Sequence, residues 1–415
     1  MRAVTFDVSI PRYLLAKTAG RIHEAAVFGR PSGLELTDVR EPAIPGRGWV
    51  RLRVLSCGIC GTDVSNLTYS ASPAMEPFGS FPAVPGHEIL AEVEDVGPSV
   101  SRVEPGQRVS VDPLLSCRVR GHPREARCPS CEIGRPGTCE MAGEDGEIRI
   151  EGEPLARGLT IGYHRDLPGG WGERMIAHED QLHPVPDPIP SAAAVLTEPL
   201  SIGMHALLNA PPARGDDVLV IGSGPIALGT IWGLRASGFD GTIVAQTKRS
   251  HEAELAEKLG ADEVVSPGLE ARQVLVETGA SAYQPIVGPE VYSGGGFPVI
   301  FDCVGSGNTI AQALRFAAPR GRVVLLGCAA EIRKLDLTFL WARELEVRGF
   351  VGYGREEWKG GARHTFQVVH ELLAEGHGPV EELVTHTFSL GEYRRGLSAA
   401  ANHARSEAVK VVLEP

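Results

Sequence analysis

Residues 218–227, VLVIGSGPIA, decide the fold of this chain. Four apolar residues predict a short buried strand, and Gly222 and Gly224 permit a tight turn directly after it. Pro225 and Ile226 then open a helical run that continues as ALGTIWGLRASG. At a strand–turn–helix of this kind, backbone amides and the helix dipole hold a phosphate group. Ala227 replaces the third glycine of the usual GxGxxG pattern, and a small residue there still permits close packing.

The same alternation continues downstream. Strands are predicted at TIVAQT (242–247), DEVVS (262–266), PVIFDCVG (298–305) and GRVVLLG (321–327), with helices at HEAELAEKLG (251–260) and NTIAQALRFAA (308–318) between them. Strands that alternate with helices form a parallel, doubly wound sheet. We therefore expect a dinucleotide-binding Rossmann domain over residues 196–349.

The segments on either side of that domain read differently. Residues 50–111 contain short Val- and Leu-rich runs, such as VRLRVL and ILAEVEDVG, separated by Gly and Pro turns. Near residue 190 the pattern becomes helical in SAAAVLTEPLSIGMHALL, and the final AVKVVLEP predicts a strand that returns to the first domain. The expected fold class is α/β, with a β-rich domain over 1–195 and 350–415 beside the doubly wound domain.

Composition excludes several classes of protein. A length of 415 residues suits two domains, and 43% hydrophobic with 22% charged residues is ordinary for a globular chain. A formal charge of −12 argues against nucleic acid or an anionic membrane as a partner. The longest uncharged stretch, 218–234, is too short and too broken to span a bilayer, and Asp7 and Arg12 disfavour a signal peptide. We expect a cytoplasmic protein.

Four of the eight cysteines lie close together, at Cys117, Cys128, Cys131 and Cys139. A Cys-x-x-Cys pair with two further thiolates nearby can complete a closed tetrahedral zinc site of the structural type. Two disulfides or four unpaired thiols are the alternative, which an intracellular chain makes less favourable.

A second set of candidate ligands is dispersed over three motifs: CGICGTD (57–63), PGHE (85–88) and TEPLSIGMHA (197–206). A catalytic zinc needs protein ligands that leave one position open, and a thiolate, an imidazole and a carboxylate satisfy that requirement. Cys60, His87 and Glu88 are the candidates. Taken singly, each residue is more often an ordinary buried or turn residue, so the inference depends on their joint occurrence.

The end of the second predicted strand indicates which nicotinamide cofactor binds. NAD-specific domains place a carboxylate there for the ribose hydroxyls, whereas this chain has Thr247, Lys248 and Arg249. A hydroxyl followed by two cations suits the 2′-phosphate of NADP, which an arginine can grip with paired bonds. We expect NADP to be preferred over NAD. The alternative is a solvated pair at a helix start, which would leave the choice open.

The order of CGICGTD, PGHE, the four cysteines and EPLS resembles that of zinc-containing medium-chain alcohol dehydrogenases, particularly the threonine- and sorbitol-dehydrogenase-like members, over residues 21–415. The resemblance implies a GroES-like catalytic domain joined to the Rossmann domain. It implies catalytic zinc on Cys60, His87 and Glu88, with no ligand role for Cys57. Glu198 would be a fourth ligand that approaches the zinc transiently.

The resemblance also implies roles around the metal and the cofactor. Asp63 would orient the histidine ligand, and Thr62 would relay the substrate proton. The strand ends at Val304, Gly305, Leu326 and Gly327 would lie beside the nicotinamide half of the cofactor.

Two features depart from the family pattern. Ser65 stands where threonine-dehydrogenase-type members have a histidine, and ten residues separate Cys117 from Cys128 where the family usually has two. The first departure weakens any transfer of threonine as the substrate, and the second indicates an enlarged loop around the structural metal.

Together these features predict an oxidoreductase with two zinc ions per chain, which transfers hydride between NADP (or NAD) and a small-molecule secondary alcohol, ketone or polyol-like substrate. The alternatives are a zinc-independent alkene reductase on the same fold and a non-catalytic zinc- and nucleotide-binding module. A homodimer or homotetramer is expected from the resemblance alone. Residues 1–20 and 283–296 suggest no function.

Overall fold

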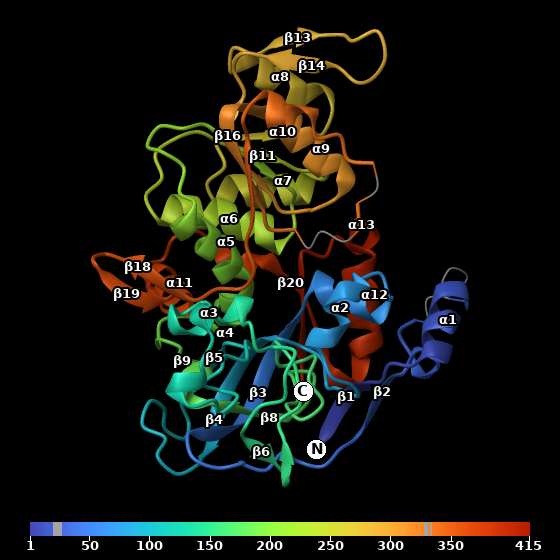
Figure 1. Cartoon of the computed structure of the whole chain (residues 1–415), viewed down its shortest axis with the longest axis vertical. Coiled ribbons are helices and arrows are strands. Elements are labelled where there is room, and N and C mark those ends of the chain that lie inside the picture. Colours follow the sequence, from blue (N-terminus) through green and yellow to red (C-terminus); the bar gives the residue numbers. More distant parts are fainter. Residues whose placement is uncertain (20–26, 328–330, 333) are drawn as a thin grey trace. The chain divides into compact units, whose positions relative to one another are not determined.

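The computed structural model describes residues 1–19, 27–327, 331–332 and 334–415. Its chain forms two compact units, whose elements are labelled in Figure 1. The first unit comprises Met1–Glu198, Gly352–Ala374 and Val384–Pro415, and the second comprises Pro199–Val351 and Glu375–Leu383. Residue 20 of the N-terminal stretch and Cys328 lie outside the described residues.

The second unit is built on a six-stranded sheet in the order β12-β11-β10-β15-β16-β17. Every neighbouring pair in it is parallel. Its strands are β10 (Val218–Ile221), β11 (Ile243–Gln246), β12 (Glu263–Val265), β15 (Phe297–Asp302), β16 (Ala317–Leu325) and β17 (Glu346–Gly349). Its helices are α6 (Pro225–Ala236), α7 (Ser250–Lys258), α8 (Leu269–Glu277), α9 (Gly307–Phe316) and α10 (Thr338–Ala342). This order confirms the predicted doubly wound domain.

The quoted stretch folds as its sequence predicts. All four residues of β10 are buried, and α6 begins at Pro225 with Gly224 as its N-cap. Gly222 has a φ of +123°, a conformation that an L side chain rarely adopts, so the turn requires glycine at this position. Leu219 and Ile300 pack on one side of the sheet in the core of this unit.

The first unit is built on a seven-stranded sheet, in the order β20-β21-β3-β4-β5-β9 with β8 paired to β3. Its strands are β3 (Trp49–Ile59), β4 (Glu88–Val96), β5 (Arg108–Val111), β8 (Arg174–His178), β9 (Leu182–Pro184), β20 (Val384–Ser389) and β21 (Lys410–Glu414). Strand β21 pairs antiparallel with β3, Val412 opposite Gly58, which confirms that the last strand returns to the first domain.

Helices of four residues or more surround this sheet or lead away from it. They are α2 (Gly61–Leu67), α3 (Pro129–Glu132), α4 (Ser191–Ala194), α11 (Thr365–Ala374), α12 (Tyr393–Ala401) and α13 (His403–Ser406), while α5 (Thr197–Asn209) begins in the first unit and continues into the second. Among the described residues, no helix is both long and apolar enough to cross a membrane.

Several elements were not predicted from the sequence. The N-terminal stretch forms β1 (Arg2–Phe6), which pairs with β2 (Leu34–Asp38), and α1 (Ile10–Ala19). The Gly- and Pro-rich stretch around 283–296 contributes to a hairpin of β13 (Ser281–Tyr283) and β14 (Val291–Ser293), drawn in gold in Figure 1. Further hairpins are β6 (Arg149–Ile150) with β7 (Glu153–Pro154), and β18 (Arg355–Trp358) with β19 (Gly361–His364).

The unit boundaries differ from the expected domains by two or three residues at the junctions near 195 and 350, and by one whole segment. Glu375–Leu383 was expected in the first domain, whereas it belongs to the second unit. Two contacts tie it there: Trp232 Nε1 donates to the carbonyl of His377, and Lys258 Nζ lies 2.6 Å from Glu382 Oε2.

Candidate metal and cofactor sites

Cys60 lies at the junction of β3 and α2, where its side chain caps the helix. Its thiol accepts a hydrogen bond from the amide of Thr62 at 3.5 Å, and Asp63 Oδ2 accepts from the amide of Cys60 at 2.8 Å. These reciprocal bonds form a capping box, the arrangement that fixes the first turn of a helix. Local sequence thus fixes Cys60, Thr62 and Asp63 relative to one another.

His87 and Glu88 approach Cys60 from the next strand. Glu88 is the first residue of β4, which pairs with β3 so that Gly58 lies opposite Glu88. The ligand atoms of Cys60, His87 and Glu88 all lie within 4.8 Å of one another, and both His87 and Glu88 are buried. The structure therefore brings together the three residues that the sequence named as catalytic zinc ligands.

Asp63 is close to one nitrogen of the His87 ring. Its Oδ1 lies 3.4 Å from His87 Nδ1 and accepts a hydrogen bond from the Tyr163 hydroxyl at 2.6 Å. Nδ1 thus faces the carboxylate, which leaves the other ring nitrogen for a metal, the usual arrangement of a ligand histidine. The predicted orienting position of Asp63 matches this geometry, whereas Tyr163 was not anticipated.

Glu88 has a second partner that sequence reasoning missed. Lys410 Nζ, at the start of β21, lies 2.6 Å from each oxygen of the Glu88 carboxylate. Both side chains are almost completely buried. Burial alone would lower the pKa of Lys410, but the neighbouring Glu88, Cys60 and Glu198 raise it. Gly58 makes room for this pair, because a Cβ built there would lie 1.9 Å from Glu88 Oε2.

Glu198 lies near this cluster without joining it as closely. It is the second residue of α5 and is buried. Burial, together with the charge of Glu88, raises its pKa to about 7, while His87, Lys410 and a hydrogen bond from Tyr353 act against the shift. A carboxyl group with this pKa exists in both protonation states near neutral pH.

The donor set fits a divalent transition metal. A thiolate, an imidazole and a carboxylate are ligands that zinc accepts, and three of them leave a fourth position open. The electrostatics agree: burial would lower the pKa of His87, yet Asp63 and Cys60 raise it well above its ordinary value. The site therefore holds an excess of negative groups, which a cation would balance.

The four clustered cysteines also converge. Cys117 Sγ lies 3.6 Å from Cys128 Sγ and 3.7 Å from Cys139 Sγ, too far for a disulfide. Backbone amides donate to the sulfurs: Cys117 N to Cys131 Sγ at 3.4 Å, and Cys131 N to Cys128 Sγ at 3.4 Å. All seven described cysteines are free. Four sulfurs with amide donors form a closed set that fits a structural zinc.

The turn after β10 carries the expected phosphate-binding features. A Cβ added to Gly224 would meet nothing within 4 Å, so the backbone at the start of α6 is open to a ligand. Glu252 lies beneath this turn and was not predicted. Its carboxylate accepts from Ser223 Oγ at 2.6 Å and pairs with Arg249 Nη1 at 2.5 Å. Glu252 thus ties Arg249 to the glycine turn.

The other two residues named for cofactor choice differ in exposure. Thr247 is buried and its amide donates to the carbonyl of Val265 at 3.0 Å, whereas Lys248 is exposed. Arg249 is half-buried. Because a guanidinium has five donors and Glu252 engages one of its nitrogens, Arg249 retains donors for an anion.

The strand ends named for the nicotinamide half converge around Asp302. Its Oδ1 accepts from the amides of Val304 and Gly305, both at 3.0 Å, and its carbonyl accepts from the amides of Leu326 and Gly327. Gly327 approaches closely, because a Cβ there would lie 2.2 Å from the carbonyl carbon of Val304. Asp302, fully buried, fixes these two loops and was not predicted.

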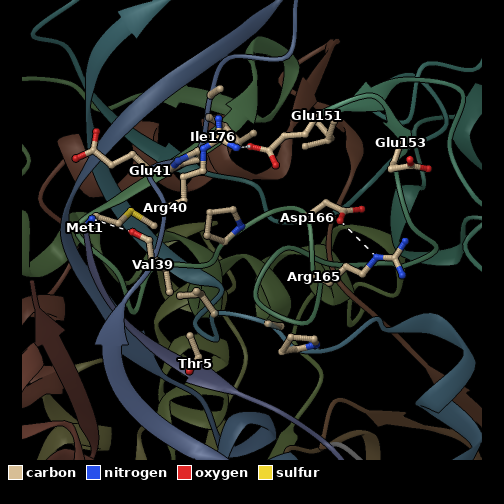
Figure 2. A pocket seen from close by; sticks show the side chains of 17 residues that line it. Met1, Thr5, Val39, Arg40, Glu41, Glu151, Glu153, Arg165, Asp166 and Ile176 are labelled. Atoms are coloured by element: carbon tan, nitrogen blue, oxygen red, sulfur yellow. Dashed lines mark hydrogen bonds and ion pairs between the residues drawn. The ribbon is translucent and has the colours of Figure 1, made fainter.

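A surface hollow of about 580 Å³ lies elsewhere in the first unit, lined by residues that include Met1, Arg40, Glu151, Arg165 and Asp166. Figure 2 shows Arg40 paired with Glu151 and Arg165 paired with Asp166, while Glu41 and Glu153 also line the hollow. The hollow has none of the ligand residues described above, so we do not regard it as the active site.

The family models match both halves of the chain. Residues 46–187 match the alcohol dehydrogenase GroES-like domain, and residues 225–367 match the zinc-binding dehydrogenase model. The L-idonate 5-dehydrogenase of Vitis vinifera is 27% identical over 363 residues, 87% of each chain. The L-threonine 3-dehydrogenase of Pyrococcus horikoshii is 29% identical over 361 residues, 86% of this chain and 88% of that one.

Solved structures agree in fold. A protein described as a zinc-binding dehydrogenase, from Sinorhizobium meliloti and bound to NADP, is 26% identical with a TM-score of 0.72, and the match covers 100% of this chain and 99% of that one. RspB from Escherichia coli, complexed with NADH, has a TM-score of 0.73 at 22% identity over 100% and 99% of the two chains. The relatives offer no support for alkene reduction or for a module without activity. The chain belongs to the zinc-type medium-chain alcohol dehydrogenase family and is an NAD(P)-linked oxidoreductase.

Proposed function

We propose that this enzyme oxidises a polar secondary alcohol, or reduces the corresponding ketone, with NADP as the preferred cofactor and zinc on Cys60, His87 and Glu88. The convergence of these three ligand atoms within 4.8 Å is the observation that carries the proposal. Relatives named as idonate, threonine and sorbitol dehydrogenases support a hydroxylated substrate of this kind. A second zinc on the four cysteines would have a structural role.

When bound, zinc would polarise the substrate oxygen and favour the alkoxide near neutral pH. The chain's own residues then have defined tasks. Asp63 holds the His87 ring from Nδ1, and the Thr62 amide stabilises negative charge on Cys60 Sγ. We propose that the Thr62 hydroxyl relays the substrate proton, accepting it as it passes its own proton on towards solvent, and that Glu198 approaches the metal transiently. A nicotinamide cofactor held at the turn of Gly222 and Gly224 would accept the hydride from the alcohol carbon, which becomes the carbonyl carbon.

The zinc assignment is tested by Cys60→Ala, with Cys57→Ala as the matched control. Cys57 is buried three residues away and has no proposed ligand role. We expect Cys60→Ala to lose one zinc per chain and at least about 10³-fold in NADP-linked turnover of an alcohol and ketone panel, because an activated oxygen is worth several kcal/mol. Nucleotide affinity should stay unchanged in both variants. Full turnover by a zinc-free Cys60→Ala enzyme would refute the assignment.

The cofactor assignment is tested by Lys248→Ala and Arg249→Ala. Removing a charge-assisted bond to the 2′-phosphate should raise the KM for NADP roughly tenfold or more and leave that for NAD nearly unchanged. Arg214→Ala is the control, because Arg214 lies in the same unit, is 91% exposed and pairs with the exposed Asp240. An unchanged KM for NADP in both variants would contradict the preference.

We propose a cytoplasmic enzyme, which the free cysteines in the described residues support. We also propose a homodimer or homotetramer, a state that light scattering of the purified protein would establish.

A further inference from the structure

Three metal-ligating side chains meet in the first unit away from the two predicted zinc sites. They are Asp112, directly after β5, His183 in β9, and His364, the last residue of β19. Their ligand atoms all lie within 4.8 Å of one another, the same criterion that the Cys60 cluster satisfies. None of the three was predicted from the sequence, because they come from segments separated by about seventy and one hundred and eighty residues and share no local motif.

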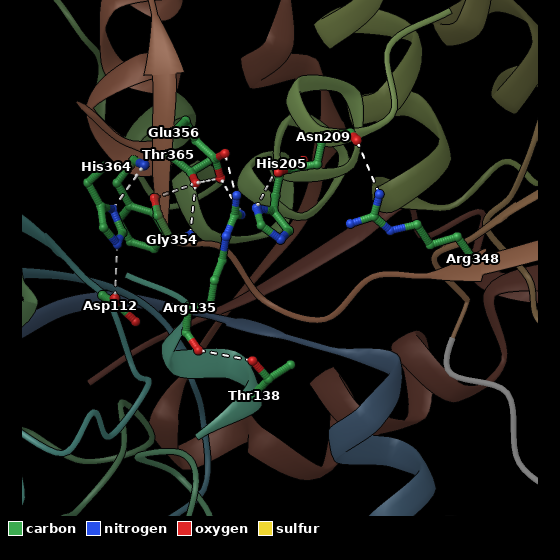
Figure 3. A network of polar contacts seen from close by, with 11 residues as sticks. Asp112, Arg135, Thr138, His205, Asn209, Arg348, Gly354, Glu356, His364 and Thr365 are labelled. Carbon is green, nitrogen blue, oxygen red and sulfur yellow. Dashed lines mark hydrogen bonds and ion pairs between the residues drawn. The ribbon is translucent and has the colours of Figure 1, made fainter. Parts of the chain in front are cut away.

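The distances within this cluster suit a shared ion. His364 Nε2 lies 3.2 Å from Asp112 Oδ2, the contact drawn as a dashed line in Figure 3. Two ligand atoms on one tetrahedral zinc lie about 3.4 Å apart, given metal–ligand distances near 2.1 Å. The rings of His183 and His364 lie face to face, with centroids 4.2 Å apart and planes inclined by 22°. The Asp112–His364 pair is thus near the spacing that an ion imposes, whereas the ring of His183, whose lone pairs lie in its own plane, would turn to point a nitrogen at the same ion.

An unsatisfied nitrogen provides independent evidence of a ligand. His183 Nε2 is buried and has no hydrogen-bond partner among the described residues, although His183 as a whole is only 6% exposed. A buried polar atom is normally paired, so this one requires an explanation.

We propose that Asp112, His183 and His364 bind a third divalent metal ion, a zinc-class ion held by two imidazoles and one carboxylate. This ligand set is typical of first-row transition metals and leaves at least one position for water. It contains no sulfur, unlike both other sites. The proposal does not depend on the role of Cys60 in catalysis.

The surroundings of the cluster orient its ligands. Asp112 Oδ1 accepts from the amide of Leu114 at 2.8 Å, which leaves Oδ2 for the ion. Phe366 packs against both histidine rings, at 5.1 and 5.4 Å between centroids, and provides an apolar wall. His364 Nδ1 accepts from the amide of Phe366 at 3.2 Å. A metal on Nε2 would move the ring proton to Nδ1, and the hydrogen bond from the Phe366 amide would be lost. The cost of one hydrogen bond is small beside the free energy of metal binding.

The position of the ion explains what it would do. Asp112 and His183 belong to neighbouring strands, since Ser110 of β5 lies opposite His183 of β9. His364 belongs to Gly352–Ala374, the segment through which the chain re-enters this unit. The ion would thus clamp the re-entering segment to the sheet. Tyr353 of that segment contacts the His364 ring at 6.1 Å and hydrogen-bonds Glu198, so the clamp would also steady the wall of the Cys60 cluster.

Metal content of the full-length protein tests the proposal. After saturation with Zn²⁺ and removal of the excess, we expect three zinc ions per chain in the wild type and two in His183→Gln and in His364→Gln. His403→Gln, which alters an exposed histidine outside the cluster, should keep three. The variant Cys60→Ala should also keep two zinc ions, namely those on the four cysteines and on the Asp112 cluster. Failure of the catalytic assignment can therefore be distinguished from failure of the third-site assignment.

Cobalt identifies which site is lost. Co²⁺ at either cysteine-containing site gives a thiolate-to-cobalt charge-transfer band, whereas Co²⁺ on Asp112, His183 and His364 cannot. We expect His183→Gln to bind one equivalent less with an undiminished charge-transfer band, and Cys60→Ala to lose both one equivalent and part of the band. If the buried His183→Gln fails to fold, His364→Gln, whose parent side chain is 20% exposed, carries the same test. A wild type that binds two ions, or folded variants that still bind three, would overturn the proposal.

Discussion

Lys410 and Glu88 form a buried ion pair beside the proposed catalytic metal, with both carboxylate oxygens 2.6 Å from one ammonium group. A buried pair of this kind gives little net stability, but removal of one partner leaves an uncompensated charge in the interior. A zinc ion bound to Glu88 would compensate that charge in place of Lys410. If zinc binds there as proposed, the two cations share one carboxylate, and the cost of losing Lys410 depends on the metal.

We expect Lys410→Met to destabilise the metal-free protein by about 3–5 kcal/mol and the zinc-saturated protein by distinctly less. Urea unfolding in chelator and in excess zinc measures both values. Lys258→Met is the control, because Lys258 and Glu382 form an exposed pair whose loss should cost no more than about 1 kcal/mol in either buffer. Equal losses for Lys410→Met with and without zinc would show that Glu88 does not bind the metal.

His164 should make stability depend on pH. Burial, opposed by a hydrogen bond to the carbonyl of Ala156, lowers its pKa to about 4 from an ordinary 6.5. Because the folded pKa is the lower one, the unfolded chain binds the proton more tightly. The stability contributed by neutral His164 is thus complete above pH 6.5 and is lost as the pH falls towards 4.

The loss over this range is on the order of 3 kcal/mol. We expect His164→Gln to have a flatter decline of unfolding free energy between pH 7 and pH 4.5 than the wild type, whatever its stability at pH 7. Urea titrations at several pH values measure both slopes, and metal loss in acid affects both proteins alike. Parallel slopes would contradict the assignment.

At the scale of elements, strand β3 holds the site open by means of one glycine. A Cβ on Gly58 would lie 1.9 Å from Glu88 Oε2, whereas a Cβ on Gly61, at the start of α2, would meet nothing within 4 Å. We expect Gly58→Ala to displace Glu88 and to lower zinc occupancy and turnover roughly 10–100-fold, as losses around a metal do. Gly61→Ala should retain both. Metal analysis and kcat/KM of the two variants measure this difference. Similar values for both variants would contradict the prediction.

Elements whose signals lie within one segment could be predicted from sequence. The strand–turn–helix at 218–227 and the returning strand at 408–415 carry their own hydrophobic patterns, and Cys60 and Asp63 share one helix cap. The residues that were missed act across long separations. Lys410 lies 322 positions from Glu88, and Tyr163 lies 100 from Asp63. The hydrophobic periodicity of the sequence does not indicate which distant side chains come into contact. Those contacts depend on the pairing of β3 with β4 and β21.

At the scale of the whole molecule, the two units depend on different ligands. The Cys60 cluster and the four clustered cysteines, which we propose bind zinc, lie in the first unit, and the glycine turn lies in the second. We expect thermal unfolding in two transitions, one for each unit. Chelation should lower the transition temperature of the first unit only. NADP at one hundred times its Kd should stabilise the second unit only, by about 2.7 kcal/mol. Differential scanning calorimetry with each reagent measures this. One transition shifted by both would show that the units unfold together.

Strand β21 is the last strand of its sheet to be synthesised on the ribosome, so the sheet is incomplete until the chain is nearly finished. Glu88 is synthesised 322 residues before its partner Lys410, and the whole second unit emerges between them. At translation rates of about 5–20 residues per second, the delay is roughly half a minute. During that time β3 has a vacant edge where β21 will later pair, and Glu88 awaits its ammonium partner. Throughout that interval the nascent chain presents an unpaired strand edge, a feature that favours aggregation.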